Sequence, residues 1–488
     1  VVLAEPAALR GLLRAAVAEA ALAEAVGDLA ALRPDLSARG VPSVAARSVI
    51  AAAVLALCAA AIFAPLVVLQ AGLAASMAGF LVVGLLRLFA AGAVVWRRPR
   101  LAGTPDRLPV YTVLVALYDE AQMLPGLVAA LERLRYPRDR LDVKIVLEAG
   151  DAATIAAALA ATRGLDHVDV VVVPPGAPRT KPRALAHALK FARGSLVAVF
   201  DAEDRPAADQ LLVAARAFAE GPAELGCVQA RLVIDRVGNR LQAQFAIEYA
   251  ALFDGLLPFL AANGLPLPLG GTSNHFRRSA LENVGGWDPW NVTEDADLGV
   301  RLARFGWRSA MIDSVTLEEA PRDFHVWRRQ RSRWIKGWLL TWIVHMRRPQ
   351  TLWAEVGPLG FFAVQAYFGG IVVSALAHPA GMLLILLHAS GRLPLAVGSH
   401  FLSDLVIAAA TLNVAFGYGA TMWLAARTLA LRRRFTLGRQ VIFMPVYWLL
   451  VSLAAWLAVF QLVARPHFWA KTPHTPHDGG RKRRTWRR

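Results

Sequence analysis

The chain has 488 residues, of which 56% are hydrophobic and 18% charged, and its formal net charge is +17. Its two cysteines, Cys58 and Cys227, exclude a disulfide framework and a cysteine-based metal site. Many basic residues flank apolar runs, as in the segments 96–100, 347–348 and 432–434. We therefore expect membrane lipids as a partner of the basic residues, and no nucleic acid.

The first hundred residues predict a membrane anchor. Residues 1–47 place apolar side chains at helical spacing, which predicts short amphipathic helices. From Ser48 to Leu86 there is no charged residue, a stretch about twice the roughly 20 residues that one crossing needs. We predict a transmembrane hairpin within 48–96, with helices over about 49–69 and 73–95 and with Pro65 and Gly72 available to break it.

Between residues 97 and 322 the pattern changes to short β-rich runs that alternate with helical segments. The runs are 110–117, 143–147, 168–173 and 196–200, and the helical segments lie around 121–135, 152–163 and 181–193. This alternation predicts an α/β domain with a mostly parallel sheet, inserted between transmembrane helices, whose ligands bind at the carboxyl ends of the strands.

The run 196–200 ends in the acidic loop Asp201-Ala202-Glu203-Asp204. Mg²⁺ and Mn²⁺ prefer oxygen ligands, and proteins often share them between a few carboxylates and the phosphates of a substrate. The loop therefore has the outline of a divalent-metal site. Taken by itself, an acidic loop is more often solvated surface.

A second acidic segment, Thr293-Glu294-Asp295, opens a helical pattern that extends to Leu302. One interpretation is helix capping, with Thr293 as the N-cap and the acids favoured by the helix dipole. The other makes Asp295 a general base that takes a proton from an acceptor hydroxyl. In isolation the two interpretations are about equally supported.

The segment 323–348 predicts an amphipathic interface helix, because tryptophans alternate there with arginines and lysines. Within it, Gln330, Arg333 and Trp334 fall on one helical turn. An indole offers an apolar face to a sugar ring, and the amide and guanidinium suit hydroxyl or diphosphate groups. This turn is a candidate site for the end of a carbohydrate.

Residues 349–465 predict a C-terminal membrane region with apolar blocks at about 357–389, 401–426 and 441–464. Basic residues at 347–348 and 427–439 both favour the cytoplasmic side, which requires an even number of crossings between them. The last block has basic residues at both ends, so either it is interfacial or re-entrant around Pro445, or one basic end is exported. We favour the first interpretation. Residues 466–488 hold a short aromatic and basic motif followed by a basic tail.

In combination and order, these motifs resemble the family 2 glycosyltransferases, and in particular the membrane-integrated synthases related to cellulose, hyaluronan and chitin synthases, in an exopolysaccharide branch. The resemblance covers about residues 49–472. It rests on Glu148 and Asp151, Asp201-Ala202-Glu203-Asp204, Thr293-Glu294-Asp295 and Gln330-Arg331-Ser332-Arg333-Trp334. The chain departs from the family pattern at Glu203, where many relatives have Asp, and in Glu148-Ala149-Gly150-Asp151, where an Asp pair is usual.

The resemblance implies a GT-A type fold and assigns roles to residues one by one. Asp295 would be the catalytic base, and Asp201 and Glu203 would bind Mg²⁺ or Mn²⁺. The donor would contact Tyr118, Glu120, Glu148, Asp151, Lys181, Arg183, Asp201, Arg333 and Lys471. The acceptor would contact Ser273, Asn274, His275, Glu294, Gln330 and Trp334. The segment Phe468-Trp469-Ala470-Lys471-Thr472 resembles a gating loop that closes over the donor.

We therefore expect an inverting, metal-dependent transferase of the inner membrane, with a cytoplasmic catalytic domain. It would take a sugar from a UDP-linked donor and extend a polysaccharide, with coupled export and accessory export subunits as possible partners. Two alternatives stay open: a non-processive enzyme that acts on a polyprenyl-phosphate or other lipid acceptor, and an inactive membrane scaffold or transporter. The few charges within the apolar spans disfavour an independent transporter.

Overall fold

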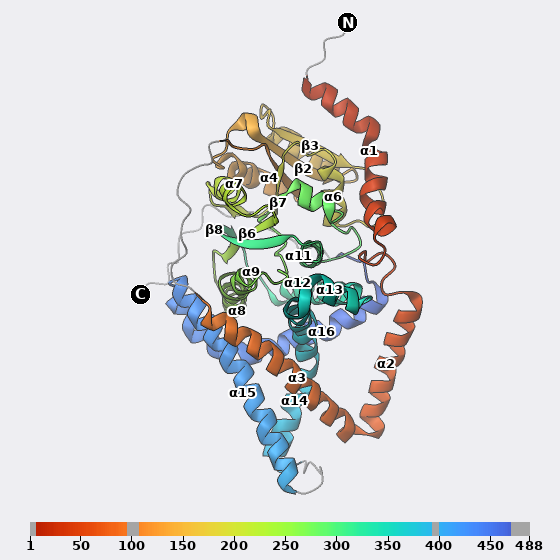
Figure 1. Cartoon of the computed structure of the whole chain (residues 1–488), viewed down its shortest axis with the longest axis vertical. Coiled ribbons are helices and arrows are strands. Elements are labelled where there is room, and N and C mark those ends of the chain that lie inside the picture. The colour runs from red at the N-terminus through yellow and green to blue at the C-terminus, as the bar shows by residue number, and fades with distance from the viewer. Residues whose placement is uncertain (1–5, 95–106, 393–399, 470–488) are drawn as a thin grey trace.

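A computed structural model describes residues 6–94, 107–392 and 400–469. It consists of an α/β domain with long apolar helices extending from one end, and a separate N-terminal helix along one flank (Figure 1). The expected fold class, a GT-A type sheet domain between apolar helices, is confirmed.

The domain is built on one eight-stranded sheet, with strand order β3-β2-β1-β4-β7-β6-β8-β5. The strands are β1 (Tyr111–Leu117), β2 (Leu141–Glu148), β3 (Val168–Val173), β4 (Leu196–Phe200), β5 (Arg205–Pro206), β6 (Leu225–Ile234), β7 (Asn274–Arg277) and β8 (Arg308–Glu318). Strands β3, β2, β1 and β4 are parallel, and Val115 of β1 pairs with both Ile145 and Phe200. Strand β7 runs antiparallel to β4 and β6, and β6 is parallel to β8.

Both faces of this sheet are covered, which explains why its central strands are apolar at nearly every position. In β1, Val113 and Val115 belong to one buried cluster, whereas Leu114 belongs to the other. The covering helices include α4 (Leu124–Glu132), α5 (Ala152–Ala161), α6 (Lys181–Leu189), α7 (Gln210–Glu220), α10 (Arg278–Asn283) and α11 (Glu294–Arg304). The predicted strands and helices of residues 110–200 agree with the structure to within a few residues.

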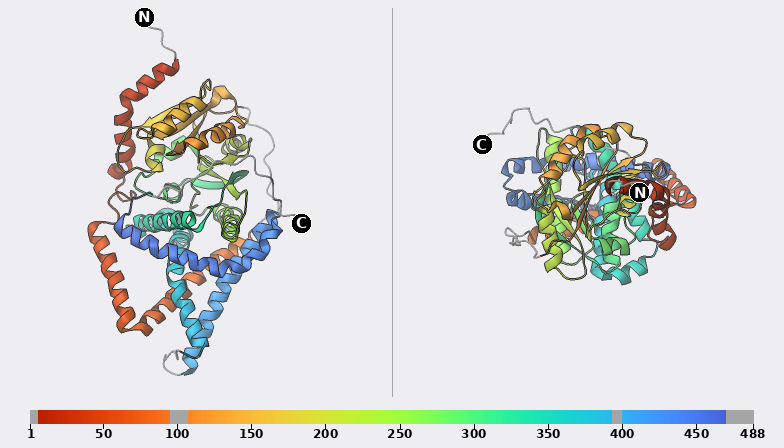
Figure 2. Two further views of the ribbon diagram at one scale, coloured as in Figure 1. Left: turned by 180° about the vertical axis from the view of Figure 1, so that it is seen from behind. Right: turned by 90° about the horizontal axis from the view of Figure 1, so that it is seen from above.

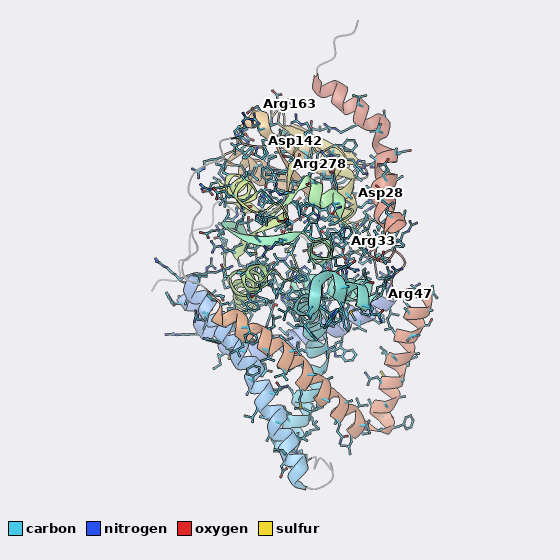
Figure 3. All side chains as sticks on the ribbon, in the orientation of Figure 1. Asp28, Arg33, Arg47, Asp142, Arg163 and Arg278 are labelled. Atoms are coloured by element: carbon cyan, nitrogen blue, oxygen red, sulfur yellow. The ribbon has the colours of Figure 1, made fainter. Side chains whose placement is uncertain are left out.

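The N-terminal segment forms a single helix, α1 (Pro6–Leu32), where the sequence suggested several short ones. Leu22 and Leu29 are buried, and Lys190 at the end of α6 donates to Glu24 at 3.0 Å and Asp28 at 3.2 Å. Asp28 is labelled in Figure 3 on this flank. Packing against the α/β domain therefore stabilises the helix as one piece.

The predicted helical hairpin is present, but its break lies at Ala64–Pro65, between α2 (Val44–Phe63) and α3 (Pro65–Gly92). Proline at the first position of α3 lacks the amide that would continue α2. Gly72 instead lies inside α3, where an added Cβ would be 2.9 Å from Ala380. It permits close packing of two long apolar helices, α3 and the helix that contains Ala380, rather than breaking one.

The C-terminal half adds α12 (Phe324–His345), α13 (Pro349–Val364), α14 (Ile371–Ala389), α15 (His400–Leu431), the 3₁₀ segment η5 (Phe435–Phe443) and α16 (Met444–Ala464). Gln365–Gly370 is a π-helix, η4, between α13 and α14. A second π-helix, η3 (Leu252–Leu256), joins α8 (Arg240–Ala251) to α9 (Leu257–Ala262).

Six helical stretches of the described chain are long and apolar enough to cross a membrane. They are Val44–Phe63, Pro65–Gly92, Arg240–Ala262, Pro349–Ala389, Asp404–Leu431 and Phe435–Ala464. Figure 1 shows α2, α3, α14 and α15 extending away from the domain, while α16 lies across its base, which Figure 2 shows from behind. The interfacial interpretation of the last apolar block stays a prediction, because Phe435–Ala464 is also long and apolar enough to cross a membrane.

Gly299 of α11 provides a test of how tightly this helix packs. A Cβ at this position would overlap the backbone carbonyl of Leu267. Because backbone cannot move as a side-chain tip can, we expect Gly299→Ala to lower the free energy of unfolding by about 1–3 kcal/mol. The matched control is Gly126→Ala in α4, which has open space around it and should be neutral or stabilising. Thermal unfolding in lipid nanodiscs measures both, and an unchanged midpoint for Gly299→Ala would contradict the packing.

Candidate active site

A cavity of about 670 Å³ lies where the carboxyl ends of the parallel strands meet helix α12. Its wall includes residues that follow β1, β2 and β4, the start of α11, one turn of α12 and the loop after α16. Residues from these distant parts of the sequence therefore share one enclosed space. The predicted site residues on its wall are Tyr118, Glu120, Glu148, Lys181, Asp201, Glu203, Glu294, Asp295, Gln330, Arg333 and Trp334.

The acidic loop after β4 presents Asp201 and Glu203 to the cavity, while Asp204 is buried behind them. Asp204 accepts hydrogen bonds from the Asp201 amide at 2.7 Å and from the Thr272 hydroxyl. Burial, together with the nearby Asp201 and Glu203, raises the pKa of Asp204 well above its usual value. Asp204 thus shapes the loop, and the two cavity carboxylates are the groups available to a ligand.

These two carboxylates fit a divalent ion that is shared with a substrate. Both offer the hard oxygen atoms that Mg²⁺ and Mn²⁺ prefer. In the described part of the chain, no group of three or more His, Cys, Asp or Glu side chains is arranged to hold a metal ion. An ion at Asp201 and Glu203 would therefore need further oxygen ligands from water or a diphosphate.

Lys181, at the start of α6, links the acidic loop to the second acidic segment. Its ammonium pairs with Asp201 and donates to the Gly271 carbonyl at 2.8 Å. Burial disfavours the ammonium, but Asp201 and Glu294 outweigh that effect and raise its pKa. Gly271 in turn lies beside the candidate base, since a Cβ added there would be 3.3 Å from Asp295 Oδ2. The metal-binding and base positions are thus neighbours in the cavity.

The segment Thr293-Glu294-Asp295 forms the turn that begins α11. Thr293 occupies the N-cap position, but its side chain makes no capping hydrogen bond. Asn291 fixes the turn instead: its Oδ1 accepts from the Thr293 amide at 3.1 Å and its Nδ2 donates to Thr341 of α12 at 2.9 Å. The turn that carries Asp295 is therefore fastened to α12.

Both acids of this turn have perturbed ionisation. Burial and the neighbouring Asp295 raise the pKa of Glu294 to about 7, although Lys181 opposes the shift. Burial likewise raises the pKa of Asp295. A carboxylate whose pKa is raised toward neutrality is a better proton acceptor, which is the property that a general base needs.

One turn of α12 supplies Gln330, Arg333 and Trp334 to the cavity. The Arg333 guanidinium donates to the Val292 carbonyl at 3.4 Å, next to the acidic turn. The Trp334 ring lies 5.9 Å from the Phe245 ring and 6.4 Å from the Tyr249 ring, measured between centroids. A cation thus faces the acids, and an aromatic cluster forms the adjoining wall.

Two predicted donor residues do not line the cavity. Arg183 is fully buried and pairs with the cavity residue Glu148. Asp151 caps α5 by accepting from the Thr154 amide at 3.1 Å, and it also accepts from the Asp119 amide at 2.5 Å. Both residues support the loops that carry the cavity wall rather than form it. Lys471 lies outside the described residues.

The predicted acceptor residues Ser273, Asn274 and His275 are also absent from the cavity wall. All three are buried at the start of β7 and make hydrogen bonds inside the domain. Ser273 bonds to Thr316 at 2.6 Å, and His275 bonds to the Tyr111 hydroxyl at 2.7 Å. Asn274 Nδ2 donates to the Gly270 carbonyl. None of the three residues is on the cavity wall, and their acceptor role stays a prediction.

Several residues on the cavity wall were missed by sequence reasoning. Glu318 is the last residue of strand β8 and Glu319 follows it, and the rule that carboxylates at a strand end mark a site would have found them. Arg179 lies over the Tyr118 ring, 5.7 Å from its centroid. The aromatic wall adds Tyr249, Phe253, Trp338 and Tyr367, for which the sequence has no local signal.

The sheet and site define a class: a GT-A fold with a carboxylate pair, a second acidic turn and an aromatic wall at the strand ends. Comparison with known proteins shows which family the domain resembles. Residues 109–337, just under half of the chain, match the sequence model of the family described as "Glycosyltransferase like family 2". This part of the chain is therefore similar to family 2 glycosyltransferases.

Curated relatives include transferases with different acceptors. The chain is 28% identical over 248 residues to the beta-monoglucosyldiacylglycerol synthase of Trichormus variabilis (strain ATCC 29413 / PCC 7937), over 50% of this chain and 52% of the relative. It is 27% identical over 253 residues to the probable glucomannan 4-beta-mannosyltransferase 1 of Arabidopsis thaliana, over 48% and 43% respectively. The chain thus spans about half the length of these relatives.

A solved structure supports the fold. The mannosyltransferase PcManGT from Pyrobaculum calidifontis, in complex with GDP-Man and Mn²⁺, superposes with a TM-score of 0.52 at 21% identity. The match covers 74% of this chain and 99% of that one.

Proposed function

We propose that this protein transfers a sugar from a nucleotide-sugar donor to a carbohydrate acceptor at the membrane surface, with inversion at the anomeric carbon. The observation that carries the proposal is the shared cavity, in which Asp201, Asp295 and Trp334 all lie on the wall. A direct displacement at the anomeric carbon needs a bound donor, a base and a bound acceptor within reach of one another. We assign the donor to the Asp201 side, the role of base to Asp295 and the acceptor to the Trp334 side.

At the donor end, Asp201 and Glu203 would hold Mg²⁺ or Mn²⁺ together with the donor diphosphate. Such an ion neutralises negative charge on a departing diphosphate. Lys181 and Arg333 both line the cavity and add positive charge, Lys181 beside Asp201 and Arg333 beside the acidic turn. Tyr118, next to Arg179, is positioned to contact the nucleoside part.

At the centre, Asp295 would accept the proton of the attacking hydroxyl while the acceptor oxygen bonds to the anomeric carbon. The leaving diphosphate and the attacking oxygen would lie on opposite faces of the sugar. The configuration at the anomeric carbon would therefore be inverted. The hydrogen bond from the Ala296 amide to Asp295 Oδ1, at 2.9 Å, leaves Oδ2 on the Gly271 side. The fastened turn therefore holds the base in one orientation.

At the acceptor end, the wall formed by Trp334, Trp338, Tyr249 and Tyr367 supports a carbohydrate acceptor, because aromatic faces pack well on sugar rings. The aromatic wall favours a growing polysaccharide as the acceptor. Tyr367 belongs to η4, which joins the cavity wall to the membrane helix α14. We extend the proposal to export of the chain past Tyr367, with the domain on the cytoplasmic side of the inner membrane.

A lipid-linked acceptor is the second candidate. Leu232, Leu252 and Leu269 make part of the same wall apolar, and one curated relative is named for a glycosyldiacylglycerol product. Product size separates the candidates, because a single addition to a lipid yields one small extractable species. A polymerase yields a ladder or a long chain.

The test uses the full chain in lipid nanodiscs with a panel of UDP- and GDP-sugars, Mg²⁺ or Mn²⁺, and product sizing with linkage analysis. We expect metal-dependent polymer from one donor. Absence of any transfer with every donor and acceptor would contradict the proposed function. In inverted vesicles given external donor, export predicts product that is protected inside, whereas wholly external polymer would contradict export.

The pH profile tests the acidic turn separately. Burial raises the pKa values of both acids, that of Glu294 to about 7. Turnover should therefore begin to fall at a higher pH than the ordinary Asp pKa of about 3.9 would give, by about tenfold per pH unit once Asp295 is mostly protonated. Glu294→Gln removes the neighbouring charge and should move this limb to lower pH. Turnover at saturating donor and metal is the measurement, and a profile that stays flat down to about pH 4, near the ordinary pKa of an Asp, would contradict Asp295 as base.

A further inference from the structure

Lys336 is a buried lysine on α12, one turn beyond Arg333, that the catalytic scheme does not use. Only 1% of its surface is exposed. Its ammonium donates to the Phe468 carbonyl at 2.7 Å and to the Arg465 carbonyl at 3.2 Å. In the part of the chain that the structure describes, Lys336 forms no ion pair with a carboxylate, so these two backbone oxygens are its recorded partners.

Both acceptors belong to the loop that follows α16, which ends at Ala464. Carbonyl groups at the C-terminal end of a helix carry partial negative charge, and a lysine there is favourable. Burying an ammonium without such partners is costly. The lysine and the loop therefore stabilise each other, and displacing the loop would leave a buried cation without its partners.

The same loop forms one wall of the active-site cavity through His467, Phe468 and Trp469. It has two further attachments. His467 Nδ1 donates to the Trp290 carbonyl at 2.8 Å, and the Arg333 guanidinium lies 5.7 Å from the centroid of the Trp469 ring. Arg333 also faces Glu294 and Asp295. The α12 turn at Arg333–Lys336 thus contacts both the catalytic acids and the loop.

We propose that Lys336 is a positioning residue, which holds the loop 465–469 against the donor end of the cavity. Lys336 is not among the residues that line the cavity. Its effect is exerted through the carbonyls of Arg465 and Phe468, which keep Trp469 near Arg333. This inference deepens the proposed function, on which it rests for the identity of the donor.

The test compares Lys336→Met, which keeps the length and loses the ammonium, with Lys336→Arg, which keeps the charge. Hydrogen exchange of residues 465–469 is followed by mass spectrometry in nanodiscs, and donor KM and kcat are measured. The matched control is Lys190→Met, which removes a half-exposed lysine that bonds to α1. Size-exclusion profiles and thermal midpoints check that each variant is folded.

We expect Lys336→Met to speed exchange in residues 465–469 and to raise the donor KM, each by about tenfold, since a hydrogen bond to a charged group is worth about that factor. Exchange elsewhere and kcat should change less, and Lys336→Arg should restore both values to near wild type. The proposal would be overturned if Lys336→Met had the same loop exchange and the same donor KM as the wild type. It would also be overturned if Lys336→Arg changed both quantities as much as Lys336→Met does. If Met prevents folding, Lys336→Gln gives the same comparison.

The exchange measurement needs no substrate, so the two proposals can fail separately. If no nucleotide sugar supports transfer, the proposed function fails while loop exchange still reports on Lys336. If transfer occurs and the loop is unaffected by Lys336→Met, only the positioning role fails.

Discussion

Replacing Asp295 by Asn is expected to lower kcat by about 10²- to 10⁴-fold while leaving donor binding nearly unchanged. Asparagine keeps the size and the hydrogen bond from the Ala296 amide but cannot accept a proton from the acceptor hydroxyl. The variant should bind a nucleoside diphosphate with Mn²⁺ as the wild type does, which isothermal titration measures. Initial rates of transfer at saturating donor give kcat.

Asp166→Asn is the matched control for this substitution, because Asp166 is exposed and distant in sequence from every cavity residue. It should have wild-type turnover. Full turnover by the Asp295→Asn protein would remove the assignment of Asp295 as base, and equal losses in binding and turnover would indicate a structural role instead.

Replacing Asp201 by Asn is expected to abolish most metal-dependent activity. A metal-bound diphosphate leaving group contributes several kcal/mol, so we expect a loss of at least about a hundredfold in kcat/KM. Chelation of the wild-type protein should give a similar loss that Mn²⁺ reverses. Titration of Mn²⁺ in the presence of nucleoside diphosphate measures the binding defect directly.

Because Asp201 also pairs with Lys181, the fold of Asp201→Asn must be checked by its thermal midpoint. Asp139→Asn, at an exposed position, serves as the control and should keep both metal binding and activity. Unchanged kcat/KM in a folded Asp201→Asn protein would contradict the metal site, and activity that is insensitive to chelation would contradict metal dependence.

Much of this site was predictable, because the sequence signals act locally. The strand that ends at Phe200 is apolar throughout and is followed at once by Asp201. One short segment therefore predicts both the strand and a carboxylate at the edge of the sheet where ligands bind. The same holds for Asp295 at the start of α11 and for the Gln330–Trp334 turn of α12. Parallel strands bring such ends to one edge, which made a shared cavity a reasonable expectation.

The sequence did not reveal the direction of a side chain where that direction depends on tertiary packing. Ser273 and His275 follow a glycine-rich loop, where the family resemblance implies residues that bind the acceptor. In the structure β7 lies between β4 and β6, and both side chains are buried there. Arg183 falls beside Lys181 in sequence, but the helix turns it to Glu148 rather than to the cavity.

The aromatic wall was missed for a related reason. Phe253 and Tyr367 lie in two π-helices, η3 and η4, and both side chains line the cavity. The sequences of these two segments predict ordinary apolar helices. A π-helix changes the direction in which the side chains after it point, and the periodicity of the sequence does not reveal this change.

The most direct test of the central claim is a structure of the full chain in nanodiscs with Mn²⁺ and a nucleoside diphosphate, in which the metal is located by its density and coordination. The account predicts Mn²⁺ bound to Asp201 and Glu203 and to diphosphate oxygens, with Asp295 and Trp334 facing the same space. Metal and nucleotide bound together at any other place on the chain would contradict it.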